Sequence, residues 1–163
     1  MKALTFWTYS LRAYGRAGVE PACLALQEEG ANVNLLLLCC WLGAAGRRLD
    51  RRQLRRTISK TAAWQQQIVV PLRQLRRGLK SESWPVSPTG RRALRASVAA
   101  AELEAEHLEQ LLLADLVAHL VRRAGKNFSA ENLAGYAAVL GVDFGAHWKT
   151  LATAAGGAVA APC

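Results

Sequence analysis

Two long stretches of helical periodicity, joined by one loop-forming segment, constrain the fold more than any other feature of this sequence. In residues 50–80 and 91–123, apolar side chains recur at intervals of three and four, the spacing of one α-helical face. Between them lies SESWPVSPTG, residues 81–90, which holds two prolines, a glycine and four hydroxyl residues and therefore indicates a loop. The sequence predicts a long antiparallel helical hairpin.

The rest of the chain also has helical periodicity. We expect further helices over residues 4–14, 19–29, 33–45, about 129–140 and 144–155. The segment 33–45 is apolar nearly all round, which is typical of a buried central helix, and Asn32 before it is a plausible N-cap. The predicted fold is all-α: one domain over residues 1–155, a helical bundle of about six helices with a long central hairpin, followed by a disordered tail at 156–163.

The apolar positions of the hairpin predict how its helices meet. The expected contact seam on the second helix steps by four and three through Leu94, Val98, Ala101, Ala105, Leu108 and Leu112. In the first helix, Pro71 lacks a backbone N–H, so we expect a kink or a restart there.

Composition favours a globular, cytoplasmic protein. Of 163 residues, 52% are hydrophobic and 20% charged, and no signal peptide is visible. The strongest apolar run, VNLLLLCCWLGAAG, is shorter than the about 20 residues that a membrane span needs. The four cysteines show no C-x-x-C spacing, so we expect reduced thiols.

Positive charge is concentrated in one half of the chain. The net charge is +9, and residues 47–95 hold 14 cations against only Asp50 and Glu82. Most of the cations are arginines, whose planar fork suits phosphate or carboxylate, although a GC-rich genome would produce the same bias.

The segment PLRQLRRGLK, residues 71–80, places four cations on one helical face. With a turn near residue 85, this face lies opposite the cations that open the second helix, and Glu102 and Glu106 lie too far along the hairpin to neutralise them. A solvated face, partly paired with acids of other helices, is the structural alternative. The predicted polyanion-binding residues are Arg73, Arg76, Arg77, Lys80, Arg91, Arg92 and Arg95, with Arg51, Arg52, Arg55 and Arg56 as a second patch and Trp84 as a candidate for base stacking.

Known catalytic patterns are missing from the sequence. Glu104 and His107 form a single E-x-x-H, whereas a di-iron bundle needs two such motifs and further glutamates. The sequence has no glycine-rich phosphate loop and no G-x-S-x-G. We therefore predict no metal and no cofactor, and the sequence leans towards a non-enzymatic role.

Three stretches of the chain are distinctive: FWTYSLRAYGRAGVEPACLALQEEGANVNLLLLCCW, PLRQLRRGLK and AELEAEHLEQLLL. In this order, over about residues 5–120, they resemble an uncharacterised proteobacterial family of small all-helical proteins, a domain of unknown function. The resemblance implies an all-helical fold and a cytosolic location, and it implies no chemistry.

Three functions fit these observations. The leading hypothesis is a non-enzymatic protein that binds RNA or a ribonucleoprotein through the basic hairpin tip. The second is an adaptor whose basic tip docks an acidic partner protein. The third is a small-molecule-binding protein or enzyme with a pocket among Trp7, Tyr9, Gln27, Asn34 and Trp41. The sequence does not indicate an oligomeric state.

Overall fold

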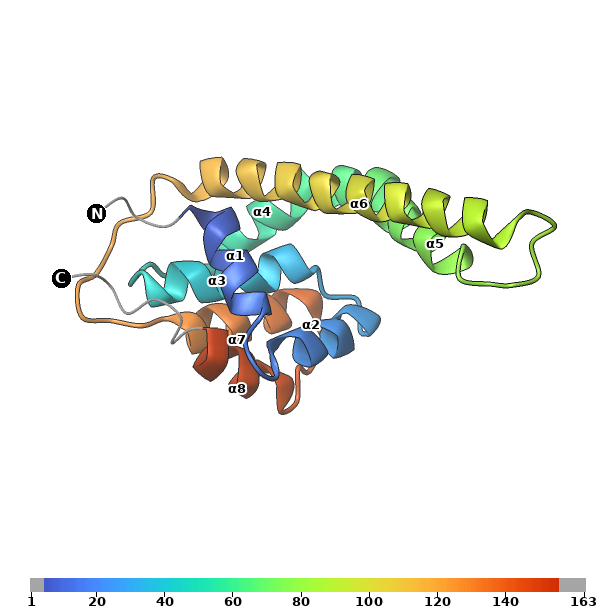
Figure 1. Cartoon of the computed structure of the whole chain (residues 1–163). Helices are drawn as coiled ribbons and strands as arrows, with labels where there is room; N and C mark the ends of the chain where they lie inside the picture. The colour runs from blue at the N-terminus through green and yellow to red at the C-terminus, as the bar shows by residue number, and fades with distance from the viewer. Residues whose placement is uncertain (1–4, 156–163) are drawn as a thin grey trace.

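Helices form every regular element among residues 5–155, the part of the chain that this computed structural model describes (Figure 1). The elements are α1 (Phe6–Tyr14), α2 (Val19–Glu28), α3 (Val33–Ala44), α4 (Arg51–Trp64), the π-helical η1 (Gln65–Val69), α5 (Val70–Gly78), α6 (Pro88–Val117), α7 (Ser129–Leu140), α8 (His147–Thr150) and the π-helical η2 (Leu151–Ala155). The all-α prediction is confirmed, and the predicted tail at 156–163 lies outside the described residues.

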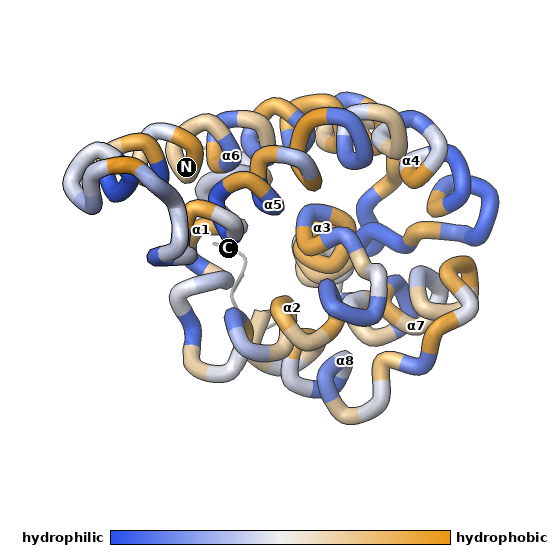
Figure 2. Tube along the Cα trace, turned by 90° about the vertical axis from the view of Figure 1, so that its right-hand side faces the viewer, coloured by the Kyte–Doolittle hydropathy of each residue, from blue (hydrophilic) through white to orange (hydrophobic). Residues whose placement is uncertain are grey.

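Helix α3 is the centre of the core. Its residues 35–40 are all buried, as its uniformly apolar sequence predicts. Helices α1, α2, α6 and α7 and the π-helical turn η2 pack against it (Figure 2). The Asn32 side chain caps it by accepting a hydrogen bond from the backbone N–H of Asn34, at 2.8 Å, so the expected N-cap is confirmed. No helix of the described residues is long and apolar enough to cross a membrane.

The predicted hairpin is present, with its first helix divided. Asp50 and Gln53 form a reciprocal capping box at the start of α4. The α4 helix then continues through the π-helical turn η1 directly into α5. Pro71, the second residue of α5, has no N–H to donate to the preceding turn, and the widened turn just before it accommodates this loss.

The second helix of the hairpin, α6, ends at Val117, six residues earlier than predicted. The chain after it turns back towards the end of α3, where the Arg123 N–H donates to the Gly46 carbonyl at 2.8 Å and the Phe128 N–H donates to the Gly43 carbonyl at 3.0 Å. These hydrogen bonds draw residues 118–128 away from the helix axis.

Helix α5, the loop 79–87 and the first part of α6 to residue 98 project beyond the other helices (Figure 1). We call this projection the arm. No residue of α5 is fully buried, and the arm is held together mainly by contact between α5 and α6. The remaining helices pack around α3, so the arm is accessible along most of its length.

The contact seam of α6 lies one residue further along than predicted. Glu102, Glu109 and Leu113 are buried where Ala101, Leu108 and Leu112 were expected, whereas Leu108 and Leu112 are 45% and 39% exposed. Only the expected seam positions 98 and 105 are buried, and Leu94 is exposed. The prediction was wrong because it treated every glutamate as solvent-facing, and two of them are held inside by polar partners.

Candidate functional site

Three of the predicted arm arginines are paired with carboxylates. Arg73 contacts Glu102 through Nε at 3.0 Å and Glu106 through Nη2 at 2.7 Å. Arg76 grips Glu102 by two hydrogen bonds, and Arg77 Nη2 lies 3.0 Å from Glu28 Oε1. The expectation that no hairpin acid reaches these cations was therefore wrong.

The physical reason is the length of the arginine side chain. The helix register was nearly correct, since Trp64 Nε1 donates to the Ala105 carbonyl at 3.0 Å, close to the predicted pairing. An extended arginine and an extended glutamate together span about two helical turns of about 5.4 Å each, so Arg73 meets acids one to two turns further along α6 than its direct opposite. The prediction compared only backbone positions along the hairpin, so it did not account for the length of the side chains.

Glu102 is held ionised by these contacts. Burial acts to raise the pKa of this carboxyl, but hydrogen bonds and charge from Arg76 and Arg73 outweigh it and lower the pKa below its usual range. The hydrogen bond that Arg76 donates to Glu102 likewise raises the pKa of Arg76. These ion pairs hold α5 against α6, a structural use of the predicted site residues.

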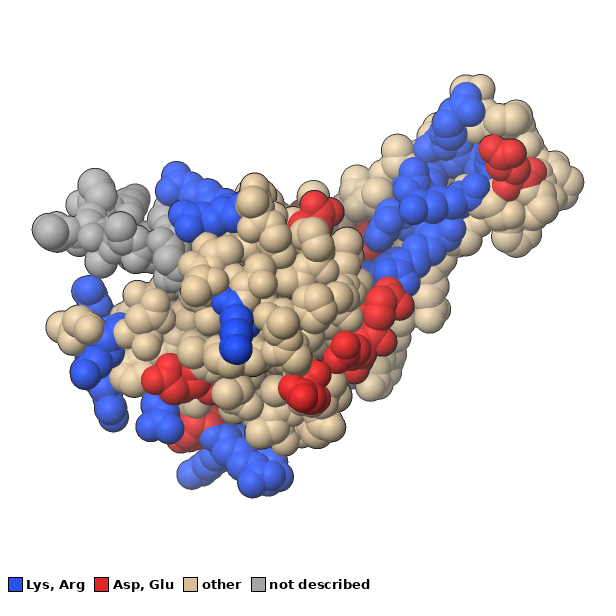
Figure 3. Space-filling view, turned by 90° about the horizontal axis from the view of Figure 1, so that it is seen from below, with Lys and Arg blue, Asp and Glu red and all other residues tan. Residues whose placement is uncertain are grey.

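The other predicted tip residues carry no ion pair among residues 5–155. They are Lys80, Arg91, Arg92 and Arg95. Arg91 donates to the Ser81 carbonyl, and Arg92 Nη2 lies 3.4 Å from the Thr89 hydroxyl. Trp84 is 53% exposed, with its indole N–H on the Gly78 carbonyl at 3.0 Å. Figure 3 shows lysine and arginine side chains gathered along one face of the arm.

The second predicted patch lies at the opposite end of the hairpin. Its four arginines, Arg51, Arg52, Arg55 and Arg56, are all exposed on α4, and none forms an ion pair within the described part of the chain. The Arg123–Gly46 hydrogen bond brings the loop after α6 beside the segment that leads into α4. We call the resulting group the α4 basic end: Arg47, Arg48, Arg51, Arg52, Arg55, Arg56, Arg122, Arg123 and Lys126.

The last three members of the α4 basic end were missed by sequence reasoning. These three residues lie about 60 positions beyond the end of α4 in the sequence, and only the return of the chain to the end of α3 places them there. The sequence did hold a signal for a basic surface here. Arg122, Arg123 and Lys126 lie close together, and no acid occurs within four residues on either side of this group.

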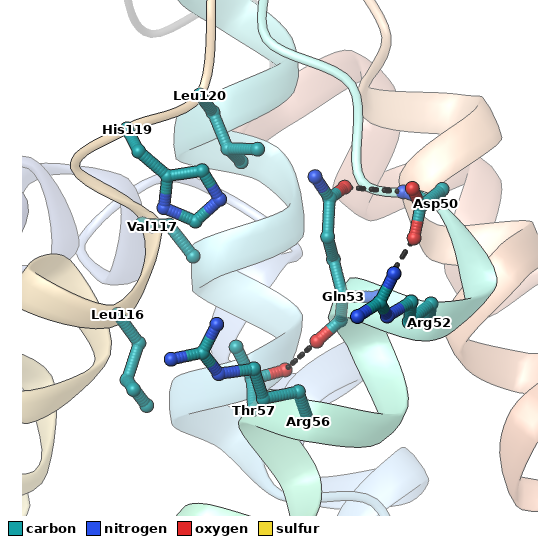
Figure 4. A pocket seen from close by; sticks show the side chains of 9 residues that line it. All are labelled: Asp50, Arg52, Gln53, Arg56, Thr57, Leu116, Val117, His119 and Leu120. Atoms are coloured by element: carbon teal, nitrogen blue, oxygen red, sulfur yellow. Dashed lines mark hydrogen bonds between the residues drawn. The ribbon is translucent and has the colours of Figure 1, made fainter.

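A cavity of about 280 Å³ lies at the α4 basic end (Figure 4). It is lined from α4 by Arg52 and Arg56 and from the end of α6 by apolar residues and His119. Figure 4 shows Arg56 and His119 on opposite sides of this hollow, while the Asp50 carboxylate is held by the Gln53 N–H at 2.7 Å. Among the residues that line this hollow, two arginines and His119 stand against one acid, Asp50, whose Oδ1 accepts the hydrogen bond from Gln53.

A buried polar network lies at the base of the arm. The Glu109 side chain accepts hydrogen bonds from Asn32 at 2.8 Å, Asn34 at 2.7 Å and Gln65 at 3.2 Å, and the residue is 1% exposed. Burial raises the pKa of this carboxyl above its usual range. Gln110 extends the network, since its amide donates to Asn34 Oδ1 at 2.8 Å.

A second cavity, of about 410 Å³, opens between α1, α2, α3 and the base of the arm. We call it the arm-base cavity. Three residues of the predicted pocket line it: Trp7, Gln27 and Asn34. Tyr9 does not, because it is buried with its hydroxyl on the Ala155 carbonyl at 2.8 Å, and Trp41 instead stacks on the ring of Phe6. The structure thus joins part of the predicted pocket to the paired arginines of the arm.

No curated protein and no solved structure matches this chain. The family described as "Protein of unknown function (DUF2390)" matches residues 5–113, a span that holds α1 to α5, most of α6 and every residue that lines the arm-base cavity. Because this match covers more than half of the chain, the protein belongs to the DUF2390 family.

Proposed function

We propose that this protein binds a polyanion, RNA alone or within a ribonucleoprotein, with the α4 basic end as the main contact and the arm tip as a second one. The arm tip consists of Lys80, Trp84, Arg91, Arg92 and Arg95. The supporting observation is that the nine cations of the α4 basic end lack an ion-pair partner among residues 5–155. Like charges gathered on one surface repel each other, and a bound polyanion removes that cost.

The chemistry of these side chains suits phosphate. A guanidinium offers two parallel N–H donors to phosphate oxygens, and release of counterions from the nucleic acid supplies affinity with little sequence preference. At the arm tip, the exposed Trp84 ring provides a surface on which a base can stack. The paired arginines Arg73, Arg76 and Arg77 are not needed for this function.

The test is fluorescence anisotropy with a labelled single-stranded RNA of mixed sequence. The variant Arg51→Glu/Arg55→Glu reverses two exposed charges of the α4 basic end, and Arg12→Glu/Lys149→Glu makes the same change in net charge elsewhere. We expect RNA affinity to fall at least about tenfold in the first variant and less than about twofold in the control. Equal losses, or no binding by the wild-type protein, would contradict the proposal.

A second candidate function is supported by the outer face of α6. Four leucines on this face are 39–53% exposed: Leu94, Leu108, Leu111 and Leu112. Exposed apolar side chains on the helix that begins at the basic tip suit an acidic protein partner that also carries apolar side chains. Affinity purification with and without nuclease separates the two functions, since a protein partner stays bound after nuclease and an RNA-bridged one is lost.

A further inference from the structure

The arm-base cavity has no role in the RNA binding proposed above. Its volume of about 410 Å³ falls within the range of about 300–1,000 Å³ typical of sites for small organic molecules. Its lining is divided by chemistry. The main apolar side chains are Trp7, Leu11, Leu24, Val33, Leu37 and Leu103. The charged ones are Arg73, Arg76, Arg77, Glu102 and Glu106.

The charged side of the cavity has an excess of one cation, because three arginines face two glutamates. The third arginine, Arg77, is paired only with Glu28, which does not line the cavity, and both side chains of that pair are about half exposed or more. An exposed pair of this kind contributes little stability and exchanges partners easily.

The arginines also keep unused hydrogen-bond donors. A guanidinium has five N–H groups in a fixed fork. Arg73 and Arg76 each use Nε and Nη2 for Glu102 and Glu106 of α6, and Arg77 uses only Nη2. Within residues 5–155, the Nη1 group of each of the three has no hydrogen-bond partner. A row of such donors can hold a carboxylate without breaking the ion pairs of Glu102.

We propose that the arm-base cavity binds a small organic monoanion, a carboxylate with an apolar body. The carboxylate lies on Arg77, with Arg76 beside it, and the apolar body packs against Trp7 and Leu103. A ligand with two negative charges is disfavoured, because Glu102 and Glu106 stand beside the arginines. A neutral ligand of the same shape gains the apolar contacts alone, which makes the charge of the ligand the basis of selectivity.

The test is isothermal titration calorimetry with octanoate, and with 1-octanol as its neutral analogue. The variant Arg77→Gln removes the charge from the cavity, and Arg92→Gln, on the arm but outside the cavity, is the matched control. Both residues are exposed, so both variants are expected to fold, which circular dichroism checks. We expect Arg77→Gln to weaken octanoate binding at least about tenfold, with octanol binding unchanged and Arg92→Gln without effect.

A second variant tests the apolar side. Leu103 is half exposed at the cavity wall, so Leu103→Trp is expected to fill the space without disturbing the core and to abolish octanoate binding. The proposal is overturned by absent saturable octanoate binding, by equal affinity for octanol, or by equal losses in the two arginine variants. It does not rest on RNA binding, so these results are independent of the anisotropy experiment.

Discussion

At Gly43, the absence of a side chain decides how closely two helices approach. A Cβ atom placed there would lie 2.1 Å from the Ser129 backbone nitrogen and 2.6 Å from the Phe128 carbonyl carbon. Both are backbone atoms at the start of α7, and the same contact includes the 3.0 Å hydrogen bond from the Phe128 N–H to the Gly43 carbonyl. Neither side can move without parting α3 from α7.

We therefore expect Gly43→Ala to lower the free energy of unfolding by about 2–3 kcal/mol, through forced separation of packed helices. Gly78→Ala is the control, because Gly78 lies in α5 and a Cβ there meets no atom within 4 Å. Alanine at that position is expected to stabilise by about 0.5 kcal/mol. Urea denaturation followed by circular dichroism measures both, and similar effects of the two substitutions would show that α3 and α7 accommodate a methyl group at Gly43.

Glu109 is a buried carboxyl whose neighbours are amides instead of cations. Because burial raises its pKa in the folded state, the folded protein holds the proton more tightly than the unfolded chain does. The contribution of this group is fully present below its ordinary pKa of about 4.5 and is lost as pH rises through the higher folded value. Ionised Glu109 thus makes folding less favourable at neutral pH than protonated Glu109 does.

Because stability falls with rising pH only where Glu109 can ionise, the variant Glu109→Gln should differ from the wild-type protein in its pH dependence. The amide does not ionise, so the wild-type protein should lose stability relative to the variant as pH rises from 4.5 upward. Urea denaturation of both proteins between pH 4.5 and 7.5 measures the difference. A difference that stays constant with pH would mean that the folded-state pKa of Glu109 is not raised.

Among elements, the ion pairs between α5 and α6 replace the apolar seam that the arm lacks. Glu102 is 6% exposed and contacts two arginines, so removing its charge leaves both guanidinium groups without their main partner. Breaking a buried pair in this way costs about 3 kcal/mol, whereas an exposed pair contributes less than about 1 kcal/mol.

The variant Glu102→Gln is therefore expected to lower the free energy of unfolding by about 3 kcal/mol, and Glu28→Gln by less than about 0.5 kcal/mol. Glu28 is the matched control because it pairs with Arg77, the arginine next to Arg76 on the same arm. Urea denaturation gives the two values, and hydrogen exchange of α5 amides should rise only in the first variant. Equal, small effects of the two substitutions would mean that the ion pairs of Glu102 contribute no more stability than an exposed pair does.

Much of the element-level fold could be predicted from the sequence. Helical spacing and the proline-containing loop indicated both helices of the hairpin, and the uniformly apolar segment indicated α3. The α6 seam could not be placed correctly, because hydrophobicity alone does not show that Glu102 and Glu109 are satisfied inside by Arg73 and Asn34. Those partners come from other helices, so the burial of each acid depends on tertiary contacts.

The same limit applies to the candidate sites. The exposed arginines of α4 were predicted, because four cations on one helical face need no tertiary information. The arm-base cavity was predicted only in part, since Trp7 and Asn34 line it while Trp41 packs on Phe6. Its charged wall comes from α5 and α6, which are distant in sequence from the aromatic residues of α1.

For the whole molecule, the hairpin separates the two unpaired basic surfaces. The α4 basic end lies where the hairpin begins, and the arm tip lies at its turn (Figure 1). Glu102 and Glu106 of α6, with their arginine partners, lie between these two ends. Figure 3 shows acidic side chains at the base of the arm, where the row of lysine and arginine side chains on the arm ends. A short RNA is therefore expected to occupy one end at a time, and the α4 basic end has more free cations.

This arrangement predicts the salt dependence of RNA binding. The logarithm of affinity falls linearly with the logarithm of salt concentration, with a slope of about −0.7 for each phosphate contact on a single strand. Removing two contacts with Arg51→Glu/Arg55→Glu should make the slope shallower by about 1.4.

The control variant Arg91→Glu/Arg92→Glu carries the same change in charge but acts at the arm tip. Because Arg91 there already donates to the Ser81 carbonyl, the slope of this variant should change less. Anisotropy titrations from low to physiological salt measure all three slopes, and a larger change for the arm variant would place the main RNA contact on the arm instead of on α4.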